Sequence, residues 1–337
     1  MLDDSAPRFR RRLQIMGLSD SVINAAWPDW WSDDADASPS ARAELRYSIA
    51  RKLGLDPRSL LDDDDSPRFV WQDTAHFKHL TGETDIQKLM LTSFGTALGG
   101  MLLAATKASA SLEERTASDL RTAILNRQPY VRLVDMLSLC WSVGIPTIHL
   151  RVFPWRQKRM TAMCARVGTR NAILLGRDSL YPAQIAFYLA HELAHISLHH
   201  LANDGVIVDL EPDTSFKVLH SSDPEEDEAD AFALELLTGN PHPVVLPANP
   251  GGGARSLAES ALSVAEDLQI EPGTLALCFG HSTGDWAIAI GALSYIYTSP
   301  KPVWREVNSI AMRQLSFSSL PDDTARYVKN VMGARAQ

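Results

Sequence analysis

The sequence predicts an α+β fold in which helices dominate. Three observations lead to this prediction. Much of the 337-residue chain consists of segments whose apolar side chains recur at helical spacing. Three short β-prone runs are confined to residues 145–176, where turn signals separate them. A long helix is expected directly after them, and it contains the pentapeptide His191-Glu192-Leu193-Ala194-His195.

Composition and charge exclude several classes of protein. With 45% hydrophobic and 22% charged residues, the chain has an ordinary globular composition. A formal net charge of −9 argues against a broad nucleic-acid footprint. The chain has an odd number of cysteines without CxxC spacing, which predicts reduced thiols at Cys140, Cys164 and Cys278. The N-terminus begins with acids and lacks the apolar centre of a secretory signal, so we expect a cytoplasmic protein.

One uncharged run, residues 89–106, is just long enough to span a membrane. It contains several glycines and hydroxyl side chains, however. Its large residues, from Leu91 to Leu102, recur at helical spacing. We therefore expect a helix buried in a protein core and no membrane association.

Four regions are predicted along the chain. Residues 1–66 form a helical domain, 67–140 a helical region, 141–245 the core that holds the site, and 254–337 a C-terminal helical region. Asp62–Asp65 and residues 241–253 are predicted to be linkers. Residues 71–80 are expected to be a helix that carries two surface histidines, His76 and His79.

The N-terminal region resembles the small helix-turn-helix domain of phage repressors. The resemblance rests on Leu-Arg-x-x-Ile-Ala-x-x-Leu-Gly-Leu-Asp-Pro-x-x-Leu-Leu at residues 45–61. It implies a DNA-binding domain. However, where that family places its recognition helix, this chain has tryptophans and acids between Trp27 and Asp36, and carboxylates there would repel phosphates. The alternative is a degenerate helical domain that serves protein contact or packing.

The three β-prone runs cover residues 145–153, 160–167 and 170–176. A small sheet followed at once by an HExxH helix is the order expected of a zincin metallopeptidase. In such enzymes an edge strand holds an extended substrate by backbone pairing. We expect residues 170–176 to be that edge strand.

The HExxH pentapeptide supplies two metal ligands and a base. Because residues four apart lie just over one helical turn apart, His191 and His195 project from one face and can hold one zinc ion. Glu192 follows the first ligand, from where a carboxylate can take a proton from a zinc-bound water. The pentapeptide alone is a weak signal, so a third ligand is needed.

His199 continues the histidine row eight residues after His191. On a straight helix this spacing corresponds to about 12 Å, which is too far for one shared ion. The sequence also lacks the glycine of an HExxHxxGxxH motif, which would turn the chain back. We therefore expect His199 to be structural or to support a ligand, without ligating.

The acidic helix predicted at residues 223–239 is the better source. At about 100° per residue, Glu225 and Glu226 fall on or beside its apolar face, whereas Glu228 points to the other side. Glu226 is the first choice for the third ligand and Glu225 the alternative. Asp230 lies one turn after Glu226, where it can orient a ligand histidine.

These two segments resemble the ImmA/IrrE-type metallopeptidases. The resemblance rests on His-Glu-Leu-Ala-His-Ile-Ser-Leu-His at 191–199, on Glu-x-x-Ala-Asp-x-Phe-Ala-x-x-Leu-Leu at 226–237, and on Gly-Ile-Pro-Thr-Ile at 144–148. It covers about residues 140–240. It implies a zinc protease, completed by the helix glutamate, that cleaves a helix-turn-helix repressor or antitoxin after stress or DNA damage, or in phage defence.

Two functions are therefore weighed. In the first, zinc held by His191, His195 and Glu226 activates water, and Glu192 moves the proton during peptide hydrolysis. In the second, the chain is a DNA-binding transcription regulator whose zinc site is structural or vestigial. Glu192 favours the enzyme, because a structural zinc has no need of it. Two side chains are candidates for assisting the oxyanion, Tyr181 and His220. Two others, Cys278 and His281, are left out of the site.

Overall fold

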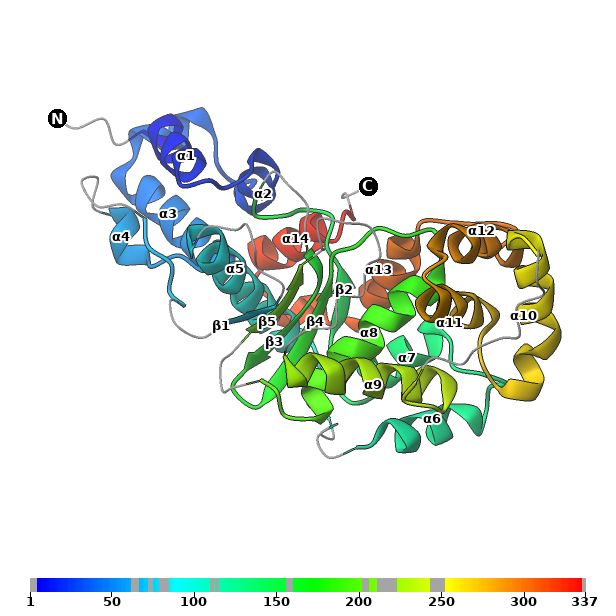
Figure 1. The fold of residues 1–337 in the computed structure, drawn as a ribbon. Coiled ribbons are helices and arrows are strands. Elements are labelled where there is room, and N and C mark those ends of the chain that lie inside the picture. Colours follow the sequence, from blue (N-terminus) through cyan, green and yellow to red (C-terminus); the bar gives the residue numbers. More distant parts are fainter. Residues whose placement is uncertain are drawn as a thin grey trace.

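A computed structural model describes residues 5–61, 67–71, 75–78, 85–109, 112, 115–155, 160–201, 206–210, 223–242 and 252–334 (Figure 1). For residues 75–78 and 209–210 it describes the backbone. The predicted linker at Asp62–Asp65, most of the one at 241–253, and the histidines His79 and His220 lie outside these residues.

The described chain is mainly helical with one mixed sheet, as the sequence predicts. The helices are α1 (Ala6–Ile15), α2 (Asp20–Ala26), α3 (Pro39–Leu53), α4 (Pro57–Leu61), α5 (Asp85–Ala104), α6 (Ala117–Leu125), α7 (Leu133–Ser142), α8 (Pro182–Ser197), α9 (Pro224–Thr238), α10 (Ala254–Leu268), α11 (Pro272–Thr283), α12 (Trp286–Ile296), α13 (Val303–Gln314) and α14 (Asp322–Val331), with short 3-10 turns at Asp33–Ala37 and Phe317–Ser319. The strands are β1 (Ala75–Lys78), β2 (Thr147–His149), β3 (Met160–Val167), β4 (Arg170–Leu175) and β5 (Val206–Leu210).

The sheet has five strands in the order β1-β5-β3-β4-β2, so the prediction of three strands was incomplete. β3 runs antiparallel to β4 and β5, and the outer pairs β1–β5 and β2–β4 are parallel. The prediction that residues 170–176 form an edge was wrong. β2 pairs along one side of β4 and β3 along the other, which leaves β4 inside the sheet.

The helix predicted at residues 71–80 is also wrong in the part that the structure describes. Residues 75–78 form β1 at the edge of the sheet, in parallel register with residues 206–209 of β5. This strand is stabilised by a partner about 130 residues later in the chain. Local helical spacing therefore does not determine its conformation.

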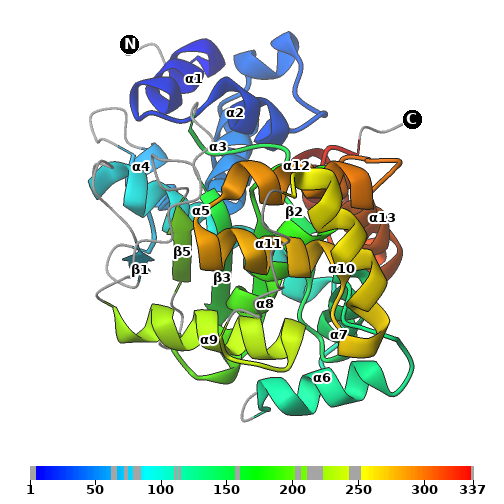
Figure 2. The same ribbon diagram turned by 45° about the vertical axis from the view of Figure 1, so that its right-hand side comes forward.

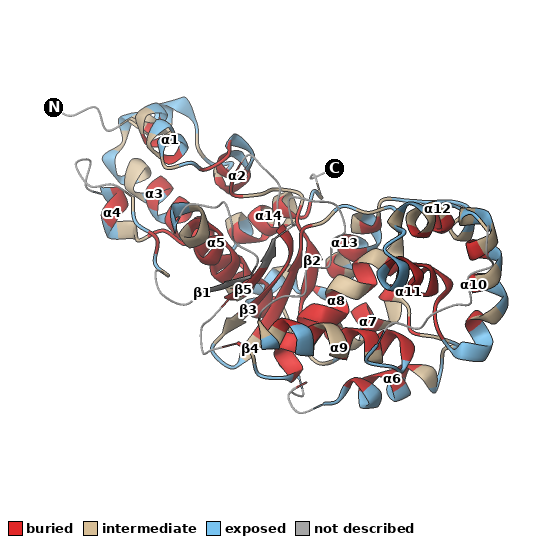
Figure 3. Cartoon of the chain, in the orientation of Figure 1, coloured by how far each residue is buried: buried red, intermediate tan, exposed pale blue. Residues whose placement is uncertain are grey.

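Helices cover both faces of the sheet. Alternate strand residues face opposite sides: Met163 and Ala165 pack with α5, the N-terminal helices and α14, whereas Ala162 and Cys164 pack with α6 to α9. Figures 1 and 2 show these two layers on either side of the strands. Because both faces are covered, β3 and β4 are almost wholly buried (Figure 3).

The uncharged run at residues 89–106 falls mostly in α5, which is buried from Met90 to Leu103 except for Gly100 and packs on the sheet. Gly95 and Gly99 let the helix approach closely: a Cβ on Gly95 would lie 2.2 Å from the sulfur of Met163. Among the described helices, none combines the length and the apolar composition needed to cross a membrane.

The N-terminal helices α1 to α4 pack in the same apolar cluster as α5 and α14. Gly54 ends α3 in the left-handed conformation, with φ of 69°, as the sequence predicts. A Cβ at this position would also lie 2.4 Å from the carbonyl oxygen of Ser93 in α5. Glycine is therefore required here both for the turn and for the contact between α3 and α5.

A buried lysine joins the N-terminal helices to the C-terminal part of the chain. Lys52 of α3 is only 1% exposed, and its Nζ donates to the carbonyl oxygen of Ala26 and to Oδ1 of Asp323, both at 2.7 Å. Ser48 donates to the other oxygen of Asp323, also at 2.7 Å. Burial lowers the pKa of Lys52, and the hydrogen bond that Lys52 donates to Asp323 opposes this shift.

Replacing Lys52 by methionine is expected to lower the free energy of unfolding by about 2–3 kcal/mol, because Asp323 and the Ala26 carbonyl lose a buried donor. Urea unfolding followed by circular dichroism measures this change. Lys88→Met in α5 is the control, since Lys88 is paired only at 3.8 Å with Asp85, whose side chain is 97% exposed. Equal midpoints for the wild type and Lys52→Met would contradict the expectation.

Candidate metal centre

The site begins with two histidines on one face of α8. Pro182 lies in the first turn of this helix, and an apolar stripe including Leu189 and Leu193 packs into the core beneath it. His191 and His195 are both buried, and their Nε2 atoms lie 3.1 Å apart. The helix thus presents two imidazole nitrogens to one point, as the HExxH spacing predicts.

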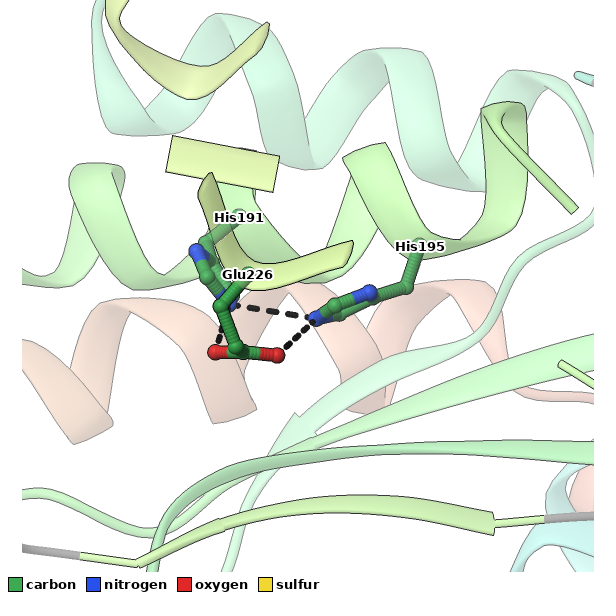
Figure 4. Close-up of side chains that lie close together, drawn as sticks. All are labelled: His191, His195 and Glu226. Carbon is green, nitrogen blue, oxygen red and sulfur yellow. Dashed lines mark hydrogen bonds and ion pairs between the residues drawn. The ribbon is translucent and has the colours of Figure 1, made fainter. Parts of the chain in front are cut away.

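The first turn of α9 brings a carboxylate to the same point (Figure 4). Oε2 of Glu226 lies 3.3 Å from Nε2 of His191, and Oε1 lies 3.4 Å from Nε2 of His195. The two helices pack against one another, and small buried residues including Ala190, Ala194, Ala229 and Ala233 belong to their shared core. In the part of the chain that the structure describes, these three side chains form a buried group that could hold a metal ion.

The spacing of the three donors suits a small divalent cation. Ligands about 2.0–2.1 Å from a tetrahedral ion lie about 3.3–3.4 Å from one another. The two Nε2 atoms lie 3.1 Å apart, and each lies 3.3 or 3.4 Å from a different oxygen of Glu226, which is close to this value. One ligand atom from each residue lies within 4.8 Å of the other two. Two imidazoles and one carboxylate are also a donor set that leaves a fourth position for water or substrate. The residues therefore fit a catalytic type of metal site.

Glu192, the predicted base, follows His191 on α8 and is fully buried. Both of its carboxylate oxygens are shielded from solvent. Its role as base stays a prediction.

Asp230 orients one of the histidines. Its Oδ1 lies 2.9 Å from Nδ1 of His191, which leaves Nε2 directed toward Glu226. The sequence predicted this position from the spacing of one helical turn after Glu226. A carboxylate on the far nitrogen fixes the tautomer and the ring orientation of a ligand histidine.

A second contact, which sequence reasoning missed, reaches the other histidine. Nδ1 of His195 lies 2.9 Å from Nδ1 of His200, and Nε2 of His200 lies 3.3 Å from Oε2 of Glu228. Glu228 was expected to point away from the site, but its side chain is long enough to reach His200. His199, the histidine that the sequence brought forward, is exposed and lies outside the donor group, in agreement with its exclusion as a ligand.

The end of α8 explains why His200 approaches the site. The helix ends at Ser197, and His199 adopts a left-handed conformation with φ of 60°. The backbone N–H of His200 then donates to the carbonyl oxygen of His195 at 3.0 Å. Non-glycine residues seldom adopt this conformation, so the turn could not be predicted from the residue type at position 199. A glycine at position 199 would have indicated it.

The position of α9 is fixed at its other end by Arg121 of α6. The buried guanidinium donates to the carbonyl oxygens of Leu236 and Leu237, at 3.2 and 2.9 Å, and to that of Gln269 at 2.7 Å. A cation at a helix C-terminus satisfies the last carbonyl groups and complements the helix dipole. Burial lowers the pKa of Arg121.

The remaining candidates do not join the donor group. Glu225, the alternative ligand, is half-buried and is absent from the His/Glu cluster. Tyr181 precedes α8 and stacks on Tyr297, with ring centroids 5.9 Å apart, about 15 Å along the helix axis from His191. Cys278 is buried in α11 and is not part of the donor group.

The chain is similar to uncharacterized immunity region protein 2 of Bacillus phage phi105. The two are 32% identical over 122 residues, which cover 34% of this chain and 73% of the phage protein. The chain therefore belongs to the same family as this phage protein. No protein-family model and no solved structure matches the chain.

Proposed function

We propose that this protein is a zinc-dependent endopeptidase with a zincin-like core, of the ImmA/IrrE type. The observation that supports the proposal most is the buried group of His191, His195 and Glu226, with Glu192 beside it on the same helix. Imidazole and carboxylate ligands together favour zinc over calcium or magnesium, which prefer oxygen ligands alone. The absence of sulfur from the donor group agrees with a catalytic rather than a purely structural ion.

The side chains have separate tasks in this proposal. A bound zinc ion supplies a Lewis acid and lowers the pKa of a water molecule. Glu192 takes a proton from the attacking water and passes it to the amine that leaves. Asp230, at 2.9 Å, holds His191 in the orientation that directs Nε2 to the site.

The proposed substrate is a helix-turn-helix repressor or antitoxin. The resemblance to ImmA/IrrE-type peptidases supports this class of substrate. The name of the phi105 relative places that phage protein in an immunity region. Cleavage would relieve repression in a stress, DNA-damage or phage-defence response. In this proposal the N-terminal helical region contacts a protein partner and does not bind DNA.

The test is to incubate the zinc-loaded protein with purified repressors of this class, starting with one encoded beside its gene, and to follow their intact masses. We expect two fragments that together equal the substrate plus one water. A chelator should abolish cleavage, and added zinc should restore it. Repressors that stay intact with a protein shown to hold zinc would count against the proposal.

The alternative function is direct DNA binding by residues 1–66. One observation favours it, because α1 carries four arginines: Arg8, Arg10, Arg11 and Arg12. Several of these arginines make contacts within the described chain, however. Arg10 contacts Asn24 and the ring of Trp27, and Arg12 donates to the carbonyl of Ser59. Absence of a gel shift at low salt would exclude this alternative.

A further inference from the structure

We infer that His200 and Glu228 are positioning residues that hold His195 in its metal-binding tautomer. This inference rests on the proposed metal site and adds two residues to it. His195 is 0% exposed, whereas the side chain of Glu228 is 65% exposed. Between them lies His200, whose side chain is 6% exposed. The three side chains thus form a row from the buried donor atom to the protein surface.

The contact between the two imidazoles requires one donor and one acceptor. Nδ1 of His195 and Nδ1 of His200 lie 2.9 Å apart, so a single proton must lie between them. A neutral histidine that offers Nε2 to a metal carries its proton on Nδ1. His195 must then be the donor, and Nδ1 of His200 must accept.

The tautomer of His200 follows from the same argument. Once its Nδ1 accepts, its own proton lies on Nε2, which is 3.3 Å from the carboxylate of Glu228. Nitrogen donor and carboxylate acceptor are therefore matched. In the opposite arrangement His200 would donate to His195, and its unprotonated Nε2 would face the carboxylate with two acceptors opposed. Glu228 thus disfavours the tautomer of His195 that cannot bind a metal through Nε2.

This arrangement differs from that of the other ligand histidine. Asp230 contacts Nδ1 of His191 directly at 2.9 Å, whereas His195 is connected to a carboxylate through a second imidazole. Glu226 and Glu192 are already buried near His195, and a further buried carboxylate would add to the desolvation cost there. The bridge through His200 leaves the charge of Glu228 near solvent while its effect reaches the buried ring.

The test measures zinc affinity in the full chain by competition with a chromophoric chelator. We expect His200→Phe, which keeps a planar ring but no nitrogen, to weaken zinc binding by about 10–100-fold. His200→Asn should recover most of the affinity, because its amide oxygen can accept near the position of Nδ1. His242→Phe, the same change at an exposed histidine outside the donor group, is the matched control and should leave the affinity unchanged.

The double mutant tests whether Glu228 acts through His200. Glu228→Ala alone should weaken binding several-fold, with Asp227→Ala as the control for the loss of a nearby charge. In the His200→Phe background the same Glu228 substitution should have no further effect, which is the non-additivity expected of residues in one network. Additive losses would overturn the inference. If His200→Phe fails to fold, the Glu228→Ala and His200→Asn variants still test the inference. Wild-type zinc affinity in Glu228→Ala would overturn it. A folded His200→Asn variant whose zinc affinity is not restored would also overturn it.

The outcome is distinguishable from that of the proposed function. If a folded His200→Phe variant binds zinc as tightly as the wild type, the inference is overturned. The peptidase proposal is unaffected by that result. A protein that shows the full pattern of affinities but cleaves no repressor would support the inference and count against the peptidase.

Discussion

Replacing Glu192 by glutamine is expected to lower the rate of substrate cleavage by about 100- to 10,000-fold, the range typical of a lost general acid–base group. Glutamine has nearly the same shape, but it cannot accept and return a proton. Because Glu192 lies beside His191 and outside the donor group, zinc affinity should stay close to that of the wild type. Initial rates of repressor cleavage and zinc competition, measured on the same preparation, test both parts.

Glu266→Gln provides a matched control for this experiment. Glu266 is exposed on α10, away from the donor group, so the same chemical change should leave cleavage intact. Full cleavage by a zinc-loaded Glu192→Gln variant would contradict the proposed role of Glu192. Loss of both cleavage and zinc would instead indicate that Glu192 helps to hold the ion.

The second large effect is expected for the third ligand. Structural zinc sites bind with about 10–16 kcal/mol, which divided among four ligands is about 3–4 kcal/mol each. Glu226→Gln should therefore weaken zinc binding by about 100- to 1,000-fold. Glu226 is buried and its two oxygens lie 3.3 and 3.4 Å from the histidine nitrogens, whereas Glu225 is absent from this cluster.

Glu225→Gln is the control, since it makes the same change one residue earlier in the same helical turn. We expect it to change zinc affinity by less than about threefold, in line with a surface substitution. Chelator competition on the two variants decides between the alternatives that the sequence left open. A large loss for Glu225→Gln with none for Glu226→Gln would reverse the assignment.

Helices were the most predictable part of the fold. Apolar spacing placed α3 within the helical domain predicted at residues 1–66 and α14 within the C-terminal helical region predicted at 254–337. These signals are local: they depend on residues within one or two turns. The hairpin of β3 and β4 was predictable for the same reason, because its turn at Gly168 is encoded in the sequence itself.

The two missed strands depend on distant partners. β5 pairs with β3, which precedes it by about 40 residues, and β1 pairs only with β5. Such pairing is specified by tertiary contacts, and short apolar segments do not reveal it alone. β5 also explains why β3 is not an edge, because it pairs with the side of β3 that a three-stranded sheet would have left open. β4 is internal for another reason: β2, which was predicted, pairs with its other side.

The site was predictable where helical geometry alone sets it. The spacing of His191 and His195 places two donors without knowledge of the fold. The apolar face of α9 narrowed the third donor to Glu226 or Glu225, and the structure brings Glu226 into the group. His200 could not be placed in this way, because its approach depends on the left-handed backbone at His199. That conformation is unusual for a residue other than glycine, so the sequence pattern favoured the wrong histidine as the nearest neighbour of the site.

The central claim is that His191, His195 and Glu226 hold a zinc ion with an open coordination position. X-ray absorption spectroscopy of the zinc-loaded protein tests it most directly, because it reports the number and type of ligand atoms. We predict two imidazole nitrogens with the remaining ligands oxygen, and a loss of bound zinc in Glu226→Gln but not in Glu225→Gln. Sulfur ligands, a third imidazole, or an unchanged spectrum of bound zinc in Glu226→Gln would contradict the claim.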